Sequence, residues 1–126
     1  MSVALYLTAS WAMPLLTGSR PSFFLSGGGL WNKPIPGFFS LSMNKAAQVN
    51  FMDSFAQIVN PKGIHVATVD IGGIVQDSDP VVNAKNIAKT FWELYEEDKN
   101  SWRQMVALGD MDDLRNYLKE QGQYYY

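Results

Sequence analysis

The spacing of apolar residues changes along the chain, and each spacing predicts a different kind of element. Residues 2–16 carry no charge and repeat apolar positions every three or four residues, which predicts a buried amphipathic helix. The apolar face of this helix consists of Leu5, Ala9, Ala12 and Leu16. A short continuous apolar run follows at residues 21–26, between a proline and three glycines, and predicts a strand buried on both faces.

A helical period returns at residues 42–59, and a β-branched run follows at residues 64–71. The apolar face of the helix is predicted to contain Ala46, Val49, Met52, Phe55, Ala56 and Val59, with Gln48 and Asp53 off this face. Residues 60–63 have the composition of a turn. The order of strand, helix and strand predicts a parallel βαβ unit in which residues 22–25 and 65–69 are neighbouring strands.

The last third of the chain predicts two more helices. A polar loop at residues 77–80 leads to Asn83, a candidate helix cap, and to a helix at residues 84–97. The apolar face of that helix is predicted to contain Ile87, Ala88, Phe91, Leu94 and Tyr95. Residues 101–106 suit a short edge segment, and residues 110–121 suit a mostly solvated helix before a frayed tail at residues 123–126. The fold class is therefore α/β, with parallel strands and crossover helices.

Composition excludes several classes of function. The net charge of −2 leaves no basic patch for nucleic acid or an anionic membrane surface. The uncharged stretch at the amino terminus contains several polar residues and is shorter than the ~20 apolar residues that a membrane span needs. With no cysteine, the chain has neither disulfides nor thiolate chemistry, and we expect it in a reducing compartment such as the cytoplasm.

Charge is distributed unevenly along the chain. Only four of the 22 charged residues fall in the first sixty positions, namely Arg20, Lys33, Lys45 and Asp53. A half with so few charges is expected to be covered on most sides. We therefore expect either a homo-oligomer or a partner that completes the sheet.

Four sequence runs together resemble one family. They are SGGG at residues 26–29, SLSMNKAA at 40–47, PKGIHVATVDIGGIV at 61–75 and NIAKTFWELYEEDKNSW at 86–102. The combination resembles the C-terminal half of the short-chain dehydrogenases/reductases, and in particular a bacterial and fungal branch with a leucine at the position of the catalytic tyrosine. The resemblance divides the chain into a C-terminal half-domain at residues 1–106 and a helix and tail at residues 107–126.

The resemblance implies a partial Rossmann-like fold from which the N-terminal nucleotide-binding half is absent. It also implies NAD or NADP as the cofactor, held at the carboxyl edge of a parallel sheet. The chain contains no glycine-rich phosphate-binding turn of the G-x-G-x-x-G type, and its glycine triplet at residues 27–29 is otherwise typical of a flexible turn. We therefore expect that this chain alone does not bind the cofactor.

The resemblance also implies candidate site residues. The family's catalytic lysine corresponds to Lys45, its tyrosine to Leu41, which has no proton to exchange, and its serine to Gly27, next to Ser26. The nicotinamide of the cofactor is implied to lie by Ile71, Gly72, Gly73 and Ile74. A solvated lysine without a catalytic role is the alternative interpretation of Lys45.

Other polar and aromatic residues favour structural roles. Ser26, Ser40 and Ser42 have no histidine or carboxylate placed to activate them. His65, the sole histidine, is expected to be a satisfied or edge residue rather than a catalyst. The acidic residues at positions 110, 112 and 113 suit a helix start, which favours negative charge. Core packing is the favoured interpretation of Trp92, Tyr95 and Trp102.

Three hypotheses about function follow. The chain is a short-chain oxidoreductase that works only when another segment supplies the nucleotide half, or a non-catalytic relative that binds a nucleotide or a partner, or a truncated product that does not fold independently. Loss of both hydroxyl positions argues against the first hypothesis. We expect a short-chain dehydrogenase-like protein, truncated and inactive alone, with a non-catalytic partner-binding or oligomerisation module as the alternative.

Overall fold

The computed structural model describes residues 2–123, so most of the predicted aromatic tail lies outside the described residues. The helices and strands occur in the order α1 (Ser2–Ala12), β1 (Ser22–Gly28), α2 (Phe39–Val59), β2 (His65–Ile71), α3 (Ala84–Glu96), β3 (Met105–Leu108) and α4 (Met111–Glu120). Short 3-10 turns lie at Met13–Leu15, Gly29–Trp31, Pro36–Phe38, Asn60–Lys62 and Lys99–Ser101. The chain is thus a mixed α/β protein.

The three strands form one parallel sheet in the order β1-β2-β3. Strands β1 and β2 pair in register from Ser22 opposite His65 to Gly28 opposite Ile71, which confirms the predicted pair of parallel neighbours. The predicted edge segment becomes a strand only from Met105 onward, where β3 pairs with the second half of β2. The boundary drawn between residues 106 and 107 falls inside β3, so the last helix continues directly from the sheet.

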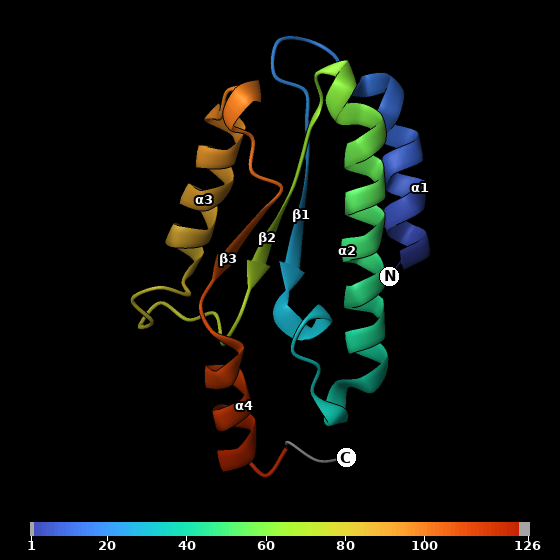
Figure 1. Cartoon of the computed structure of the whole chain (residues 1–126). Helices are drawn as coiled ribbons and strands as arrows, with labels where there is room; N and C mark the ends of the chain where they lie inside the picture. The colour runs from blue at the N-terminus through green and yellow to red at the C-terminus, as the bar shows by residue number, and fades with distance from the viewer. Residues whose placement is uncertain (1, 124–126) are drawn as a thin grey trace.

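Helices cover both faces of the sheet (Figure 1). On one face, α1 and α2 bury a cluster with β2 through residues such as Leu5, Met52, Phe55 and Val66. On the other face, α3 places Leu94 against Ala67 and Val69 of the central strand. Alternate residues of β2 therefore point into two separate cores, as expected for a strand that is buried on both faces.

Strand β1 differs from the prediction in burial and length. Its residues are half-buried, or exposed at Ser26, rather than buried on both faces, because β1 is an edge strand in the described chain. The glycines expected to open a loop instead continue the strand through Gly28, and Gly29 begins a 3-10 turn. A Cβ atom at Gly27 would lie 2.9 Å from Cγ2 of Thr68, so the close approach of β1 and β2 requires glycine there.

Helix α1 is confirmed, with Leu5, Ala9 and Ala12 on its buried face, although it ends at Ala12 and continues only as a 3-10 turn. Helix α2 begins at Phe39, three residues earlier than expected. The prediction for its apolar face was wrong at two positions, since Gln48 is buried and Ala46 is exposed. Gln48 faces α1 and the edge of β1, a direction that the spacing along α2 alone did not indicate.

Helix α3 begins as predicted at its cap, where the Oδ1 atom of Asn83 accepts a hydrogen bond of 2.8 Å from the backbone N–H of Asn86. Its buried side chains are Thr90 and Leu94. Core packing was the wrong interpretation for Trp92 and Tyr95, which are both exposed, because α3 presents only a narrow stripe to the sheet. Within residues 2–123, neither α3 nor any other helix has the length and apolar character to cross a membrane.

Candidate functional site

The candidate site lies where the strands end at their carboxyl side, which is where ligands bind in parallel α/β sheets. A cavity of about 130 Å³ lies there, and it is lined by Gly29, Lys33, Asp70, Gly72, Gly109 and Asp110, among others. These residues come from the 3-10 turn after β1, the end of β2 and the turn between β3 and α4. The parallel topology therefore brings together three chain segments that are far apart in the sequence.

Asp70 is the carboxylate in the wall of this cavity. The indole Nε1 of Trp31 donates a hydrogen bond of 2.9 Å to its Oδ2 atom. Its Oδ1 atom is buried and has no hydrogen-bond partner in residues 2–123. The bond between Trp31 and Asp70 fixes the 3-10 turn after β1 to the central strand, and the free oxygen is an acceptor without a donor.

Charged groups border the same cavity. The Nζ atom of Lys33 lies 3.6 Å from Oδ1 of Asp110 and 3.6 Å from Oδ2 of Asp112. Asp110 caps α4, because its Oδ1 atom also accepts a hydrogen bond from the backbone N–H of Asp112. That backbone bond, and secondarily the charge of Lys33, hold the pKa of Asp110 below its ordinary value. The predicted helix start is confirmed. Residues 2–123 contain no group of three or more histidine and carboxylate side chains that could hold a metal ion.

Close backbone packing encloses the glycines that follow β2. The N–H of Gly72 donates a 2.7 Å hydrogen bond to the carbonyl of Leu108, and a Cβ atom on Gly72 would lie 3.1 Å from the backbone of Asp110. A Cβ atom on Gly109 would overlap the carbonyl oxygen of Gly72. The turn between β3 and α4 therefore covers Gly72. Gly73 has a φ of +104°, a conformation that favours glycine.

The other candidate cofactor residues lie on different sides of this turn. Ile71 packs in the core beneath α3, whereas Ile74 is exposed in the loop that follows. A nicotinamide at Gly72 and Gly73 would have to occupy space that the turn between β3 and α4 now fills.

The candidate catalytic residues do not gather around the cavity. Leu41 packs against an apolar cluster that contains Leu30, Ile35 and Met111. Lys45 lies one turn further along α2, is partly exposed, and makes no hydrogen bond or ion pair with the described residues. Ser26 is exposed and likewise has no hydrogen-bond partner there. The hydroxyl of Ser42 donates to the carbonyl of Phe38 at 2.8 Å, a bond within its own helix turn.

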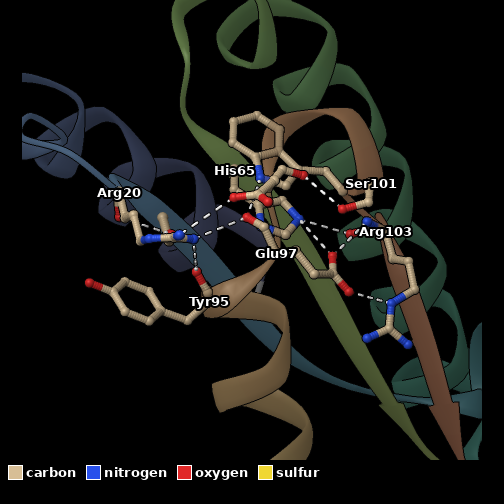
Figure 2. A network of polar contacts seen from close by, with 9 residues as sticks. Arg20, His65, Tyr95, Glu97, Ser101 and Arg103 are labelled. Carbon is tan, nitrogen blue, oxygen red and sulfur yellow. Dashed lines mark hydrogen bonds and ion pairs between the residues drawn. The ribbon is translucent and has the colours of Figure 1, made fainter.

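His65 lies at the opposite, amino end of the sheet, within a network of polar contacts (Figure 2). Its Nε2 atom donates a 2.9 Å hydrogen bond to the carbonyl of Arg103, and its ring stacks on Trp102 with centroids 4.6 Å apart. A carboxylate oxygen of Glu97 accepts from the backbone N–H of Arg103 at 2.9 Å, while the backbone carbonyl of Glu97 accepts from Arg20 at 3.2 Å. The prediction of a satisfied histidine holds only at Nε2, because the buried Nδ1 atom has no hydrogen-bond partner among the described residues. His65 also lies on the central strand rather than on an edge.

A larger cavity of about 470 Å³ opens beside this network, lined by Arg20, His65, Tyr95, Glu97, Lys99 and Trp102, among others. Two of its charged groups already have partners, since Arg20 lies 3.5 Å from Asp98 and Glu97 pairs with Arg103. The network joins the ends of α3 and β3 to β2. We therefore assign it a structural role and place the candidate site at the carboxyl end.

The sequence analysis named the glycine pair after β2, of which Gly72 lines the cavity, and it missed Trp31, Lys33 and Asp70. No local signal marks the bond from Trp31 to Asp70, because its partners are 39 residues apart in the chain. Comparison of the chain with protein-family models, with curated proteins and with solved structures finds no match.

Proposed function

We propose that the chain is a short-chain dehydrogenase/reductase-like module of NAD(P)-dependent oxidoreductase ancestry, which transfers no hydride by itself. The observation that carries the proposal is the parallel unit β1-α2-β2, with Lys45 in the early part of the crossover helix and Gly72-Gly73 directly after β2. Helices on both faces of the parallel sheet further support a partial Rossmann-like fold. The cofactor class, NAD or NADP, follows from the resemblance.

The inactivity of the chain follows from its candidate catalytic residues. Leu41 has no ionisable group and packs among apolar side chains. General acid/base catalysis contributes about 10²–10⁴-fold, so its loss brings any residual hydride transfer close to background. The chain also contains no G-x-G-x-x-G turn to hold a pyrophosphate, and the turn between β3 and α4 covers Gly72.

A fusion experiment tests this proposal. The amino-terminal nucleotide-binding half of a short-chain dehydrogenase is joined to the chain, and NADH and NADPH binding is followed by cofactor fluorescence. With a ketone or aldehyde supplied as the hydride acceptor, we expect the fusion to bind cofactor without oxidising it, the Leu41→Tyr fusion to gain measurable oxidation, and the matched Leu41→Phe fusion to gain none. The unfused chain should oxidise neither cofactor, and neither should its Leu41→Tyr variant. Failure of every fusion to bind cofactor would contradict the proposed ancestry, whereas turnover by the unfused chain would contradict its inactivity.

A specific observation favours a second function, that of a non-catalytic association module. The outer surfaces of α1 and α2 expose large apolar side chains, namely Val3, Tyr6, Leu7, Trp11, Phe39, Met43 and Ile58. Helix α1 has no charged residue, and α2 has only Lys45 and Asp53. Exposed apolar surface of this kind is typical of protein interfaces. Light scattering after size-exclusion chromatography at micromolar concentration should give a mass above that of the monomer, and a monomer would contradict this function.

A further inference from the structure

The outer edge of β1 carries backbone groups that no described residue pairs. The carbonyl of Pro21 accepts a 3.0 Å hydrogen bond from the N–H of His65. In a parallel pair, the backbone N–H and C=O groups of every second residue point to the same side, so this bond shows which residues of β1 face β2. Phe23 and Leu25 point their backbone groups toward β2, and Phe24 and Ser26 point theirs away. Within residues 2–123, β1 has β2 as its only neighbouring strand, so the outward groups of Phe24 and Ser26 remain unpaired.

A second, independent observation lies beside this edge. Gln48 of α2 is only 7% exposed, yet its amide makes no hydrogen bond with the described residues, and its Oε1 atom is buried. A buried carbonyl oxygen without a donor is destabilising, and native proteins rarely leave one. A half-turn of the amide exchanges its oxygen and its NH₂ group, so Gln48 can accept from or donate to an incoming group.

Gln48 lines a slot between α1 and the edge of β1. The slot has a volume of about 430 Å³, and its walls are formed by Ala4, Leu5, Thr8, Phe23, Leu25 and Gln48, among others. None of these side chains is charged. The slot runs beside unpaired backbone groups that repeat at every second residue, which is the period of a β-strand.

We propose that this edge and slot bind an extended, uncharged strand from a partner polypeptide. The strand pairs with the outward backbone groups of Phe24 and Ser26, places apolar side chains of one face in the slot, and offers a hydrogen-bonding group to Gln48. A charged side chain would be desolvated in the slot without a counter-charge, so the occupant is uncharged on that face.

A second copy of the chain does not fit this slot. In that copy, the Phe23 and Leu25 side chains that would have to enter the slot already pack under its own α1 and α2 helices. The occupant is therefore a strand whose slot-facing side is not covered by helices of its own.

A tethered strand tests the proposal without requiring a tight-binding free peptide. A segment of about six residues, with threonine and valine alternating, is fused to the amino terminus of the full chain. The linker has about fifteen glycine and serine residues, for an average reach of ~22 Å. The matched control fusion has proline in place of two valines, which removes the N–H groups needed for pairing. Hydrogen exchange at the amides of Phe24 and Ser26 is the main measurement, and the melting temperature is the second.

Pairing should slow exchange at these two amides by at least about tenfold relative to the unfused chain and raise the melting temperature, whereas the control fusion should change neither. In the tethered protein, Ser26→Pro should remove most of the protection at Phe24, because the N–H that it deletes points away from β2. Ser26→Thr keeps that N–H and should retain the protection. Gln48→Leu should stabilise the unfused chain, because it removes an unpaired amide. It should also reduce the rise in melting temperature that the tethered strand produces.

Equal protection by the control fusion, or full protection of Phe24 in the Ser26→Pro protein, would overturn the proposal. Protection in the unfused chain that rises with protein concentration would show that a second copy takes the edge, and it would overturn the choice of occupant.

Discussion

The two faces of the sheet are covered in different ways. Helices α1 and α2 share the burial of one face among many apolar side chains and expose a largely uncharged surface to the outside. Among the described helices, only α3 covers the other face, with Leu94 as its fully buried residue and lysines and glutamates on its outer side. Trp92 and Tyr95 are exposed on α3, but they sit among these charges.

The two faces therefore differ in how well their outer surfaces suit contact with water. An outer face with mixed charges is stable in water, as on α3, and needs no partner. A layer of two helices with two charges between them leaves apolar area in contact with water. We therefore expect changes on the buried side of α3 to alter the stability of one chain, and changes on the outer face of α1 to alter association between chains.

Leu94→Ala should have the largest effect. Leu94 is 0% exposed and packs against Ala67 and Val69, so the substitution removes a large buried side chain and leaves a cavity. Such substitutions cost about 2–5 kcal/mol of unfolding free energy. Urea denaturation followed by circular dichroism measures the loss.

Trp92→Ala is the matched control for Leu94→Ala on the same helix. Trp92 is 59% exposed, and we expect its removal to change the free energy of unfolding by no more than about 0.5 kcal/mol. If both substitutions lower the free energy of unfolding equally, the packing of α3 does not depend mainly on Leu94. The proposed contrast between the two faces of the sheet would then be wrong.

The sequence predicted the features that depend on local spacing. The pairing of β1 with β2 follows from two apolar runs around a helix, and Asn83 is a cap because it precedes an amphipathic run. It could not predict which neighbour covers each side of a helix, so it misplaced Gln48 and Tyr95.

The details of the candidate site depended even more on contacts distant in sequence. The close packing of Gly109 on Gly72 and the bond from Trp31 to Asp70 arise only when the strands are side by side. A resemblance to a family named positions such as Lys45, but it could not show that the turn between β3 and α4 lies over Gly72.

Trp11→Lys should have the next largest effect, on association rather than stability. Trp11 is 70% exposed on α1, where a charge would have to be desolvated in any interface that forms across this face. We expect at least about a tenfold weaker self-association, measured by light scattering over a concentration series, because a buried hot-spot residue contributes about 2 kcal/mol or more and about 1.4 kcal/mol corresponds to tenfold.

Trp92→Lys on α3 is the control, since it makes the same substitution at a similarly exposed tryptophan. It should leave association unchanged. Equal weakening by both variants would mean that association does not use the face formed by α1 and α2.

The smallest expected effect is a pH dependence of local stability at two acidic residues, Asp79 and Asp110. Hydrogen bonds from the backbone N–H groups of Val82 and Val81 lower the pKa of Asp79, and the N–H of Asp112 together with Lys33 lowers that of Asp110. A carboxylate whose pKa is lower in the folded state stabilises the fold above its ordinary pKa. That contribution is lost as the pH falls through the folded-state value.

Acidification should therefore loosen the start of α4 and the loop before α3 first, while α1 and α2 keep their structure. Amide resonances of Asp112 and Val82 in an NMR titration report this local change, and those of Ala9 and Met52 serve as internal references. Asp110→Asn keeps a capping oxygen but cannot titrate, so it should flatten the response at Asp112 and leave that at Val82 intact. Simultaneous loss of all four resonances at one pH would mean that the two faces unfold as one unit, and that the acidic caps do not act locally.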